Sequence, residues 1–148
     1  ARDAEITELC RSLFAGTVRD NLTLGRPLSD TASWQALETV GLASTLRGLS
    51  DALDTPLMPG GAPLSELHAR GLLIARALLL QPRLLVVDGV LDGVAAKLRQ
   101  CWLETVASSD RPWTLLVLTA DPHIAHTCSS VHELRDGELH ARPRLSPV

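Results

Sequence analysis

The sequence lacks a glycine-rich phosphate-binding loop. No Gly-x-x-x-x-Gly-Lys-Ser/Thr segment occurs among its 148 residues, and Lys97 is its single lysine. In such a loop successive backbone N–H groups surround the phosphate oxygens, and the lysine reaches the outermost phosphates. The 148 residues therefore contain no phosphate site of this type.

Cysteines and long apolar runs are also scarce. The three cysteines are widely spaced and include no Cys-x-x-Cys pair, so we expect free buried thiols and a reducing compartment. No stretch reaches the ~18 apolar residues that a membrane span needs, because Arg76 interrupts the richest run. No basic segment followed by an apolar one marks a secretory signal. We expect the isolated chain to be soluble.

The chain carries no excess of positive charge. Its formal net charge is −3, and its 14 basic residues are scattered rather than clustered. Nucleic-acid-binding domains need a basic patch to neutralise phosphates, so a nucleic-acid partner is not expected. A hydrophobic content of 45% over 148 residues predicts one domain with a modest core.

Two short apolar runs predict strands. Residues 84–88 read Leu-Leu-Val-Val-Asp between a proline and a glycine, and residues 114–118 form a second such run. Runs of this length and composition are typical of strands buried on both faces, as in parallel sheets. The first run ends in an acid, Asp88. The pair Asp136-Gly137 between apolar residues predicts a β-hairpin after the second run.

Helical periodicity marks segments before and between the strands. We expect Ser33 to cap a helix that carries Trp34, Leu37 and Val40, and Ser65 to cap a second helix. Alternation of strand, helix and strand implies right-handed crossovers and a parallel sheet. Apolar residues three and four apart form the faces of the second and third helices: Leu67, Gly71, Ile74, Ala75 and Leu78, then Val94, Leu98, Cys101, Trp102 and Thr105.

Taken together, these segments resemble the ATP-binding cassette of exporter-type ABC transporters. The run that ends in Asp88 is similar to the Walker B strand, and the Arg-Ala-Leu helix after Leu64-Ser65 is similar to the signature helix. The remaining matches follow in order and cover nearly the whole chain: 13–21 after the Q-loop, 53–61 before the signature, 114–119 before the H-loop, and 134–139 in the closing hairpin.

The resemblance implies an α/β fold. We expect a partial P-loop NTPase (RecA-like) parallel sheet with an ABC helical subdomain and a C-terminal β-hairpin. Residues 1–148 would form one partial cassette, with 12–82 as helical subdomain and signature helix and 83–148 as the C-terminal half of the RecA-like core. The phosphate loop and its strand would precede residue 1 in a longer protein. One side of strand 84–88 is then expected to lack its usual neighbour or to borrow another segment.

The resemblance also implies ATP and Mg²⁺ as cofactors. Asp88 would be a Mg²⁺ ligand, because an acid at the carboxyl end of a parallel strand faces the ligand crevice. The alternative is an acid that only caps a loop. Ser65 would donate to the γ-phosphate of ATP held by a second cassette, and the alternative is a helix cap that serves its own helix.

Most of the family's functional positions are changed in this chain. The signature Leu-Ser-Gly-Gly-Gln reads Leu64, Ser65, Glu66, Leu67 and His68. The Q-loop Gln position holds Leu9, the catalytic Glu position Gly89, the D-loop Asp position Ala95 and the H-loop His position Ala120. A carboxylate at Glu66 would repel phosphate, since two like charges ~4 Å apart interact by about 4 kcal/mol at an effective dielectric near 20. We expect no ATP hydrolysis by this chain.

These features predict a degenerate nucleotide-binding-domain segment of an ABC exporter. It would act at the cytoplasmic side of the cell membrane as structural or coupling partner to an intact cassette and a transmembrane domain. The alternative is a decayed cassette that serves as a protein-interaction module outside transport. His123 and His126, three residues apart, have no acid or cysteine at ligand spacing and are expected to face solvent.

Overall fold

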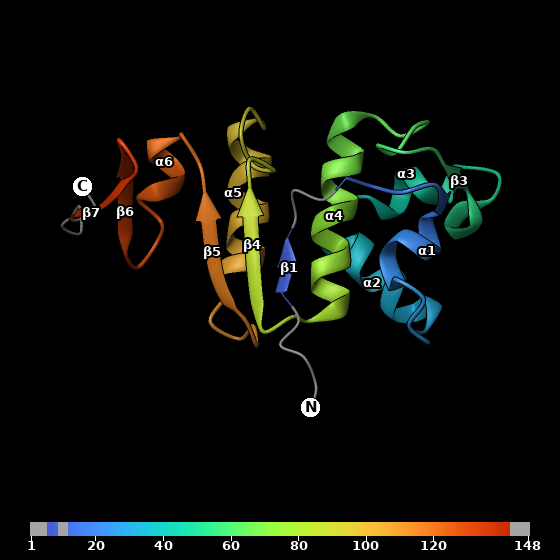
Figure 1. Cartoon of the computed structure of the whole chain (residues 1–148). Helices are drawn as coiled ribbons and strands as arrows, with labels where there is room; N and C mark the ends of the chain where they lie inside the picture. The colour runs from blue at the N-terminus through green and yellow to red at the C-terminus, as the bar shows by residue number, and fades with distance from the viewer. Residues whose placement is uncertain (1–5, 9–11, 143–148) are drawn as a thin grey trace.

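A short parallel sheet forms the centre of the molecule. The computed structural model describes residues 6–8 and 12–142. Strand β4 (Leu84–Asp88) lies in the middle, between β1 (Ile6–Glu8) and β5 (Thr114–Leu118), and pairs with both in parallel. The expected parallel sheet is therefore confirmed. The crossover from β4 to β5 runs through α5 (Ala96–Ala107), which lies behind the sheet in Figure 1.

A group of short helices lies beyond α4 (Glu66–Leu80), on the side of the sheet away from β5 (Figure 1). It comprises α1 (Val18–Thr23), α2 (Asp30–Thr39), α3 (Ala43–Arg47), the 3-10 turn η1 (Ala52–Asp54), and the two-residue strands β2 (Gly16–Thr17) and β3 (Pro56–Leu57). Both α1 and α2 pack against α4. Helix α4 is consequently buried along most of its length and joins this group to the sheet.

The hydrophobic core is continuous across α4. Trp102 of α5 is 1% exposed, and its indole N–H donates to the backbone oxygen of Val40 at 3.1 Å. A Cβ on Gly71 would lie 3.0 Å from Leu42 and 3.2 Å from Trp102. A glycine in the middle of α4 thus lets the indole approach closely, which offsets the low helix propensity of glycine.

The chain ends in α6 (Pro122–Ala125) and a hairpin of β6 (Val131–Arg135) and β7 (Glu138–Arg142). Asp136 and Gly137 both have positive φ, +52° and +85°, as a two-residue hairpin turn requires. The predicted hairpin is therefore confirmed. It lies at the far end of the molecule from the helical group (Figure 1), and Leu134 and Leu139, which pair across it, are about 70% exposed.

Three helix predictions were wrong in detail. Helix α2 is capped by Ser29, whereas Ser33 is fully buried one turn further on and donates to the oxygen of Ser29. Leu67 is 41% exposed rather than part of the buried face of α4. Val94 is buried but lies before α5, in the loop that leads into it. Helices α2 and α5 begin a few residues from where the sequence pattern put them, whereas α4 begins after Ser65 as expected and carries Leu67 on an exposed side.

Strand β4 has no gap beside it, because β1 and β5 pair with it on either side and form the two edges of the described sheet. Of the two expected outcomes, a missing neighbour is therefore wrong, and a borrowed segment stays a prediction. Strand β5 was expected to be buried, but Leu116 and Leu118 are 50% and 46% exposed. Cys101, expected to be buried, is exposed on α5, and Cys128 is partly buried; both thiols are free. Cys10 falls outside the described residues.

Candidate functional site

The candidate site lies where β4 and β5 end. Asp88, the last residue of β4, is exposed there. Gly89 turns the chain with a φ of +65°, and its N–H donates to the oxygen of Leu118 at 3.3 Å. The carboxyl ends of parallel strands are the usual place for ligands in α/β folds. Asp88 lies at this end of the sheet, as the sequence predicted.

The loop from Gly89 to Ala95 is firmly packed. Val90, Leu91 and Val94 are at most 6% exposed. The carboxylate of Asp92 accepts from the hydroxyl of Thr119 at 2.7 Å. This bond ties the loop after β4 to the residue that follows β5. Ala95, at the D-loop position, precedes α5 and provides no side-chain cap.

The altered signature segment starts α4. The hydroxyl of Ser65 accepts from the backbone N–H of His68 at 3.2 Å, so Ser65 caps its own helix. Glu66 forms an ion pair with Arg70 at 2.5 Å, with its own side chain 81% exposed. Leu67 points partly to solvent. The charge of Glu66 is thus matched within the chain, which weakens the expected repulsion of phosphate.

The H-loop position is occupied by an exposed Ala120. The next residue, Asp121, caps α6 by accepting from the N–H of His123 and forms an ion pair with Arg99 at 2.7 Å. Its own N–H donates to the hydroxyl of Thr119 at 3.0 Å. The polar groups next to Ala120, those of Thr119 and Asp121, are therefore used in hydrogen bonds and an ion pair within the protein.

A magnesium ion would find few ligands in this chain. Among residues 6–8 and 12–142, no three His, Cys, Asp or Glu residues gather to hold a metal ion. Mg²⁺ is commonly held by one or two carboxylates together with substrate phosphates. Asp88 fits such a site only when phosphate oxygens complete it. Leu9, at the Q-loop position, falls outside the described residues, and His123 and His126 are both exposed, as expected.

The sequence analysis did not predict the contacts that four polar residues make at this end of the sheet: Arg70, Asp92, Thr119 and Arg99. The Glu66–Arg70 pair is four residues apart on a helix, a spacing that sequence alone can reveal. Thr119 and Asp92 are 27 residues apart, and no local pattern joins them. Only the sheet pairing brings them together.

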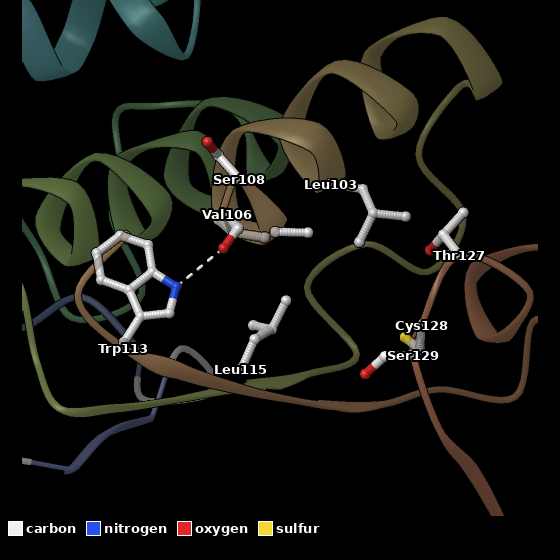
Figure 2. A pocket seen from close by; sticks show the side chains of 9 residues that line it. Leu103, Val106, Ser108, Trp113, Leu115, Thr127, Cys128 and Ser129 are labelled. Atoms are coloured by element: carbon white, nitrogen blue, oxygen red, sulfur yellow. Dashed lines mark hydrogen bonds between the residues drawn. The ribbon is translucent and has the colours of Figure 1, made fainter. Parts of the chain in front are cut away.

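A cavity of about 220 Å³ lies between α5, β5 and the segment after α6. Figure 2 shows side chains around it from α5, from β5 and from the segment after α6, among them Leu103, Leu115 and Cys128. The indole N–H of Trp113 donates to the oxygen of Val106 at 2.9 Å, so this polar group is already satisfied. The lining offers no charged side chain, and the cavity is not suited to a nucleotide.

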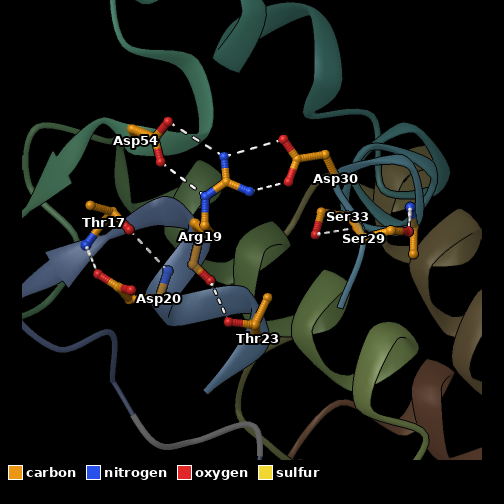
Figure 3. A network of polar contacts seen from close by, with 9 residues as sticks. Thr17, Arg19, Asp20, Thr23, Ser29, Asp30, Ser33 and Asp54 are labelled. Atoms are coloured by element: carbon orange, nitrogen blue, oxygen red, sulfur yellow. Dashed lines mark hydrogen bonds and ion pairs between the residues drawn. The ribbon is translucent and has the colours of Figure 1, made fainter. Parts of the chain in front are cut away.

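A polar network holds the start of α1 (Figure 3). Thr17 and Asp20 form a reciprocal capping box, which lowers the pKa of the Asp20 carboxyl. Arg19 binds Asp54 at 2.9 Å and also pairs with Asp30. These hydrogen bonds, first to Asp54 and then to Asp30, raise the pKa of Arg19 above its usual value, and Arg19 lowers that of Asp54. The network fixes α1 relative to α2 and η1.

Arg76 connects α1 to α4. It is 5% exposed and donates to the backbone oxygen of Asn21 at 2.6 Å and to its side-chain oxygen at 3.0 Å. Burial lowers the pKa of this guanidinium. Asn21, itself fully buried, also bonds to the N–H and the oxygen of Phe14. The segment 13–21 is thus bound to the helix that carries the altered signature.

Comparisons with known proteins identify similar sequences and one similar fold. No protein-family model matches the sequence. The chain is 31% identical over 147 residues to the alpha-factor-transporting ATPase of Saccharomyces cerevisiae. This alignment covers 93% of the chain and 11% of that protein. It is 39% identical over 108 residues to the glutathione/L-cysteine transport system ATP-binding/permease protein CydC of Escherichia coli. This alignment covers 72% of the chain and 18% of that protein.

A solved structure of a bacterial Atm1-family ABC exporter with ATP bound has a similar fold. The TM-score is 0.81 at 22% sequence identity, over 92% of this chain and 24% of that one. The chain therefore spans a quarter or less of each protein named. In its described part, none of the helices has the length and apolar character required to cross a membrane.

Proposed function

This chain is a segment homologous to the ATP-binding cassette of ABC exporters, and we propose that it is a catalytically degenerate cassette segment. It acts as structural and coupling partner to an intact, ATP-hydrolysing cassette and to a transmembrane domain. Its place is the cytoplasmic side of the membrane. Residues 12–82 serve as the coupling and signature part, and residues 83–148 as the half of the core that carries Asp88.

The observation that carries this proposal is the set of groups at the end of β4 and β5. The resemblance assigns Gly89 and Ala120 to the positions of the family's water-activating acid and histidine, and neither residue has a side chain that transfers a proton. Positioned acid–base groups are worth about 10²- to 10⁴-fold in rate. The nearby Asp92 and Asp121 are bonded to Thr119 and Arg99. The described site thus retains one free acid, Asp88, and no base held in line with it.

The coupling part of the proposal rests on the connection between α1 and α4. The segment 13–21 corresponds to the region where cassettes of this type meet the transmembrane domain. Asn21 and Arg76 bind it to α4 through buried hydrogen bonds. A displacement of α1 would therefore be passed to the signature end of α4 without any bound nucleotide.

A second candidate function is a protein-interaction module outside transport. The exposed apolar residues Leu116 and Leu118 of β5 and Leu134 and Leu139 of the hairpin favour it, because such residues are common in contact surfaces. The two functions predict different sequences upstream in the gene. An open reading frame that extends upstream into a glycine-rich loop and six apolar membrane-spanning segments supports the transporter role. A stop codon immediately upstream supports the interaction module.

Calorimetric titration with Mg·ATP tests the proposal directly. The 148-residue chain is expected to show no saturable binding in the micromolar range, because most of the N–H donors that offset phosphate desolvation are missing. Asp88→Ala, with Asp110→Ala as a charge-matched control in an exposed turn, completes the experiment. Saturable binding that Asp88→Ala abolishes and Asp110→Ala retains would show that the chain holds its own nucleotide.

A further inference from the structure

Glu66 replaces a glycine of the signature and has a partner within its own helix. Its carboxylate is 2.5 Å from the guanidinium of Arg70, one turn along α4. The Glu66 side chain is 81% exposed, whereas that of Arg70 is 28% exposed. The acid therefore lies at the surface and orients a guanidinium that is directed inward.

Arg70 uses its remaining donors on the loop after β4. One terminal nitrogen donates to the backbone oxygen of Asp92 at 2.6 Å and to that of Val90 at 3.4 Å. The guanidinium is a rigid fork, so one end can bind a carboxylate while the other binds carbonyl groups. Arg70 thus connects α4 to loop residues 20 and 22 positions away in sequence.

The loop is also held from its other side. Thr119 donates to the carboxylate of Asp92 at 2.7 Å, and Gly89 donates to the oxygen of Leu118 at 3.3 Å. Val90 and Leu91 anchor the same loop in the core with exposures of 5% and 2%. Every one of these contacts is made by the protein itself, and none needs a phosphate or a metal ion.

We propose that Glu66 and Arg70 form a strut that fixes the loop 89–95 against α4 independently of nucleotide. Glu66 is then a positioning residue that acts through Arg70, and its place in the altered signature serves the chain's own loop rather than a partner's phosphate. The strut does not depend on the coupling role proposed above. A result that refutes the strut would therefore not refute the coupling role.

Hydrogen exchange of the backbone amides of residues 90–94 in the full chain measures the strut. Arg70→Met is expected to speed exchange in this loop on the order of ten-fold, because charge-assisted hydrogen bonds to two carbonyls are lost. Arg47→Met is the matched control, since Arg47 forms an exposed ion pair with Glu38 on the distant helices. The control is expected to leave exchange in the loop unchanged, and an unchanged loop in Arg70→Met would overturn the proposal.

The reversed pair separates a strut from an ordinary helix ion pair. Glu66→Arg combined with Arg70→Glu keeps two opposite charges one turn apart but directs an acceptor at the loop carbonyls. Exchange in the loop is expected to be as fast as in Arg70→Met. Retained protection would mean that the ion pair only supports α4, and the strut would be rejected.

One further variant keeps the test decisive if the Arg70 variants unfold. Glu66→Gln changes an exposed residue, and exchange in the loop, measured without added nucleotide, is expected to rise about two- to three-fold, because a neutral amide binds the guanidinium more weakly. No effect of Glu66→Gln would contradict the strut.

Discussion

At the scale of single residues, the side chains around Asp88 serve the fold more than chemistry. Ser65 caps α4, Asp121 caps α6, and Asp92 is bonded to Thr119. Each of these polar groups has a partner within the chain, which is the usual state of polar groups that stabilise structure. Catalysis needs instead a group held free and in line with a bound reactant.

Restoring a single catalytic group is therefore expected to fail. In Gly89→Glu the new side chain has space, since a Cβ at this position meets no atom within 4 Å. Its φ of +65° is unfavourable for a residue with a side chain, by about 1–2 kcal/mol. Gly89→Ala carries the same backbone strain without the acid. Phosphate release from Mg·ATP by Gly89→Glu is expected to equal that of Gly89→Ala.

The reason is that catalytic residues act as one unit and fail together. Ala120 provides no histidine, and the 148 residues contain no glycine-rich phosphate-binding loop. Turnover by Gly89→Glu that exceeds the alanine variant and disappears on adding Asp88→Ala would refute the inactive-partner role.

At the scale of elements, one buried cation contributes to the contact between α1 and α4, beside the apolar packing of Val18 and Leu22. Arg76 binds only the oxygens of Asn21 and lies 5.9 Å from the ring of Phe14 among its described contacts. A buried guanidinium without a carboxylate is stabilised by such dipoles and by the ring. The link is therefore directional, and it joins the segment 13–21 to α4.

Arg76→Met is expected to destabilise the chain by about 1–3 kcal/mol. The thioether fills much of the space but leaves the backbone oxygen of Asn21 buried without its donor. Arg47→Met removes an exposed ion pair with Glu38 and a ring contact with Trp34, and it is expected to cost less, about 0.5–1 kcal/mol. Urea unfolding of both variants provides the measurement. Equal stability of Arg76→Met and Arg47→Met would show that the link between α1 and α4 contributes little.

At the scale of the whole molecule, β5 is one of the two edges of the described sheet, and β1 is the other. Leu116 and Leu118 are half exposed on β5. An apolar strand with unpaired backbone groups is a template for pairing with another chain. The cavity beside it, lined by Leu103, Val106 and Leu115, adds further uncovered apolar surface.

The isolated chain is accordingly expected to self-associate as its concentration rises. Leu116→Lys combined with Leu118→Lys is expected to shift the chain toward the monomer, because charges on an edge strand oppose pairing. Leu134→Lys combined with Leu139→Lys, which removes exposed leucines from the hairpin instead, is the matched comparison. Sedimentation analysis of the three proteins checks this. A hairpin variant that is more monomeric than the β5 variant would place the contact elsewhere.

The sequence by itself determined the order and type of the main elements. The apolar runs at 84–88 and 114–118, the cap at Ser65 and the pair Asp136-Gly137 are local signals, because strand, helix and turn preferences depend on neighbouring residues. The same local motifs supported the resemblance to the cassette and placed Asp88 at the end of a parallel strand.

Only the tertiary structure decided which strand lies at the edge and which polar groups meet. Buried and exposed apolar strands have the same composition, and the alternating exposure of β5 shows that the face with Leu116 and Leu118 is left uncovered by the described elements. Arg70 reaches the loop after β4, Thr119 reaches Asp92, and Arg76 reaches Asn21 across 20 to 55 residues of sequence. Such contacts are fixed by the packing of α4 and the sheet, and no local pattern encodes them.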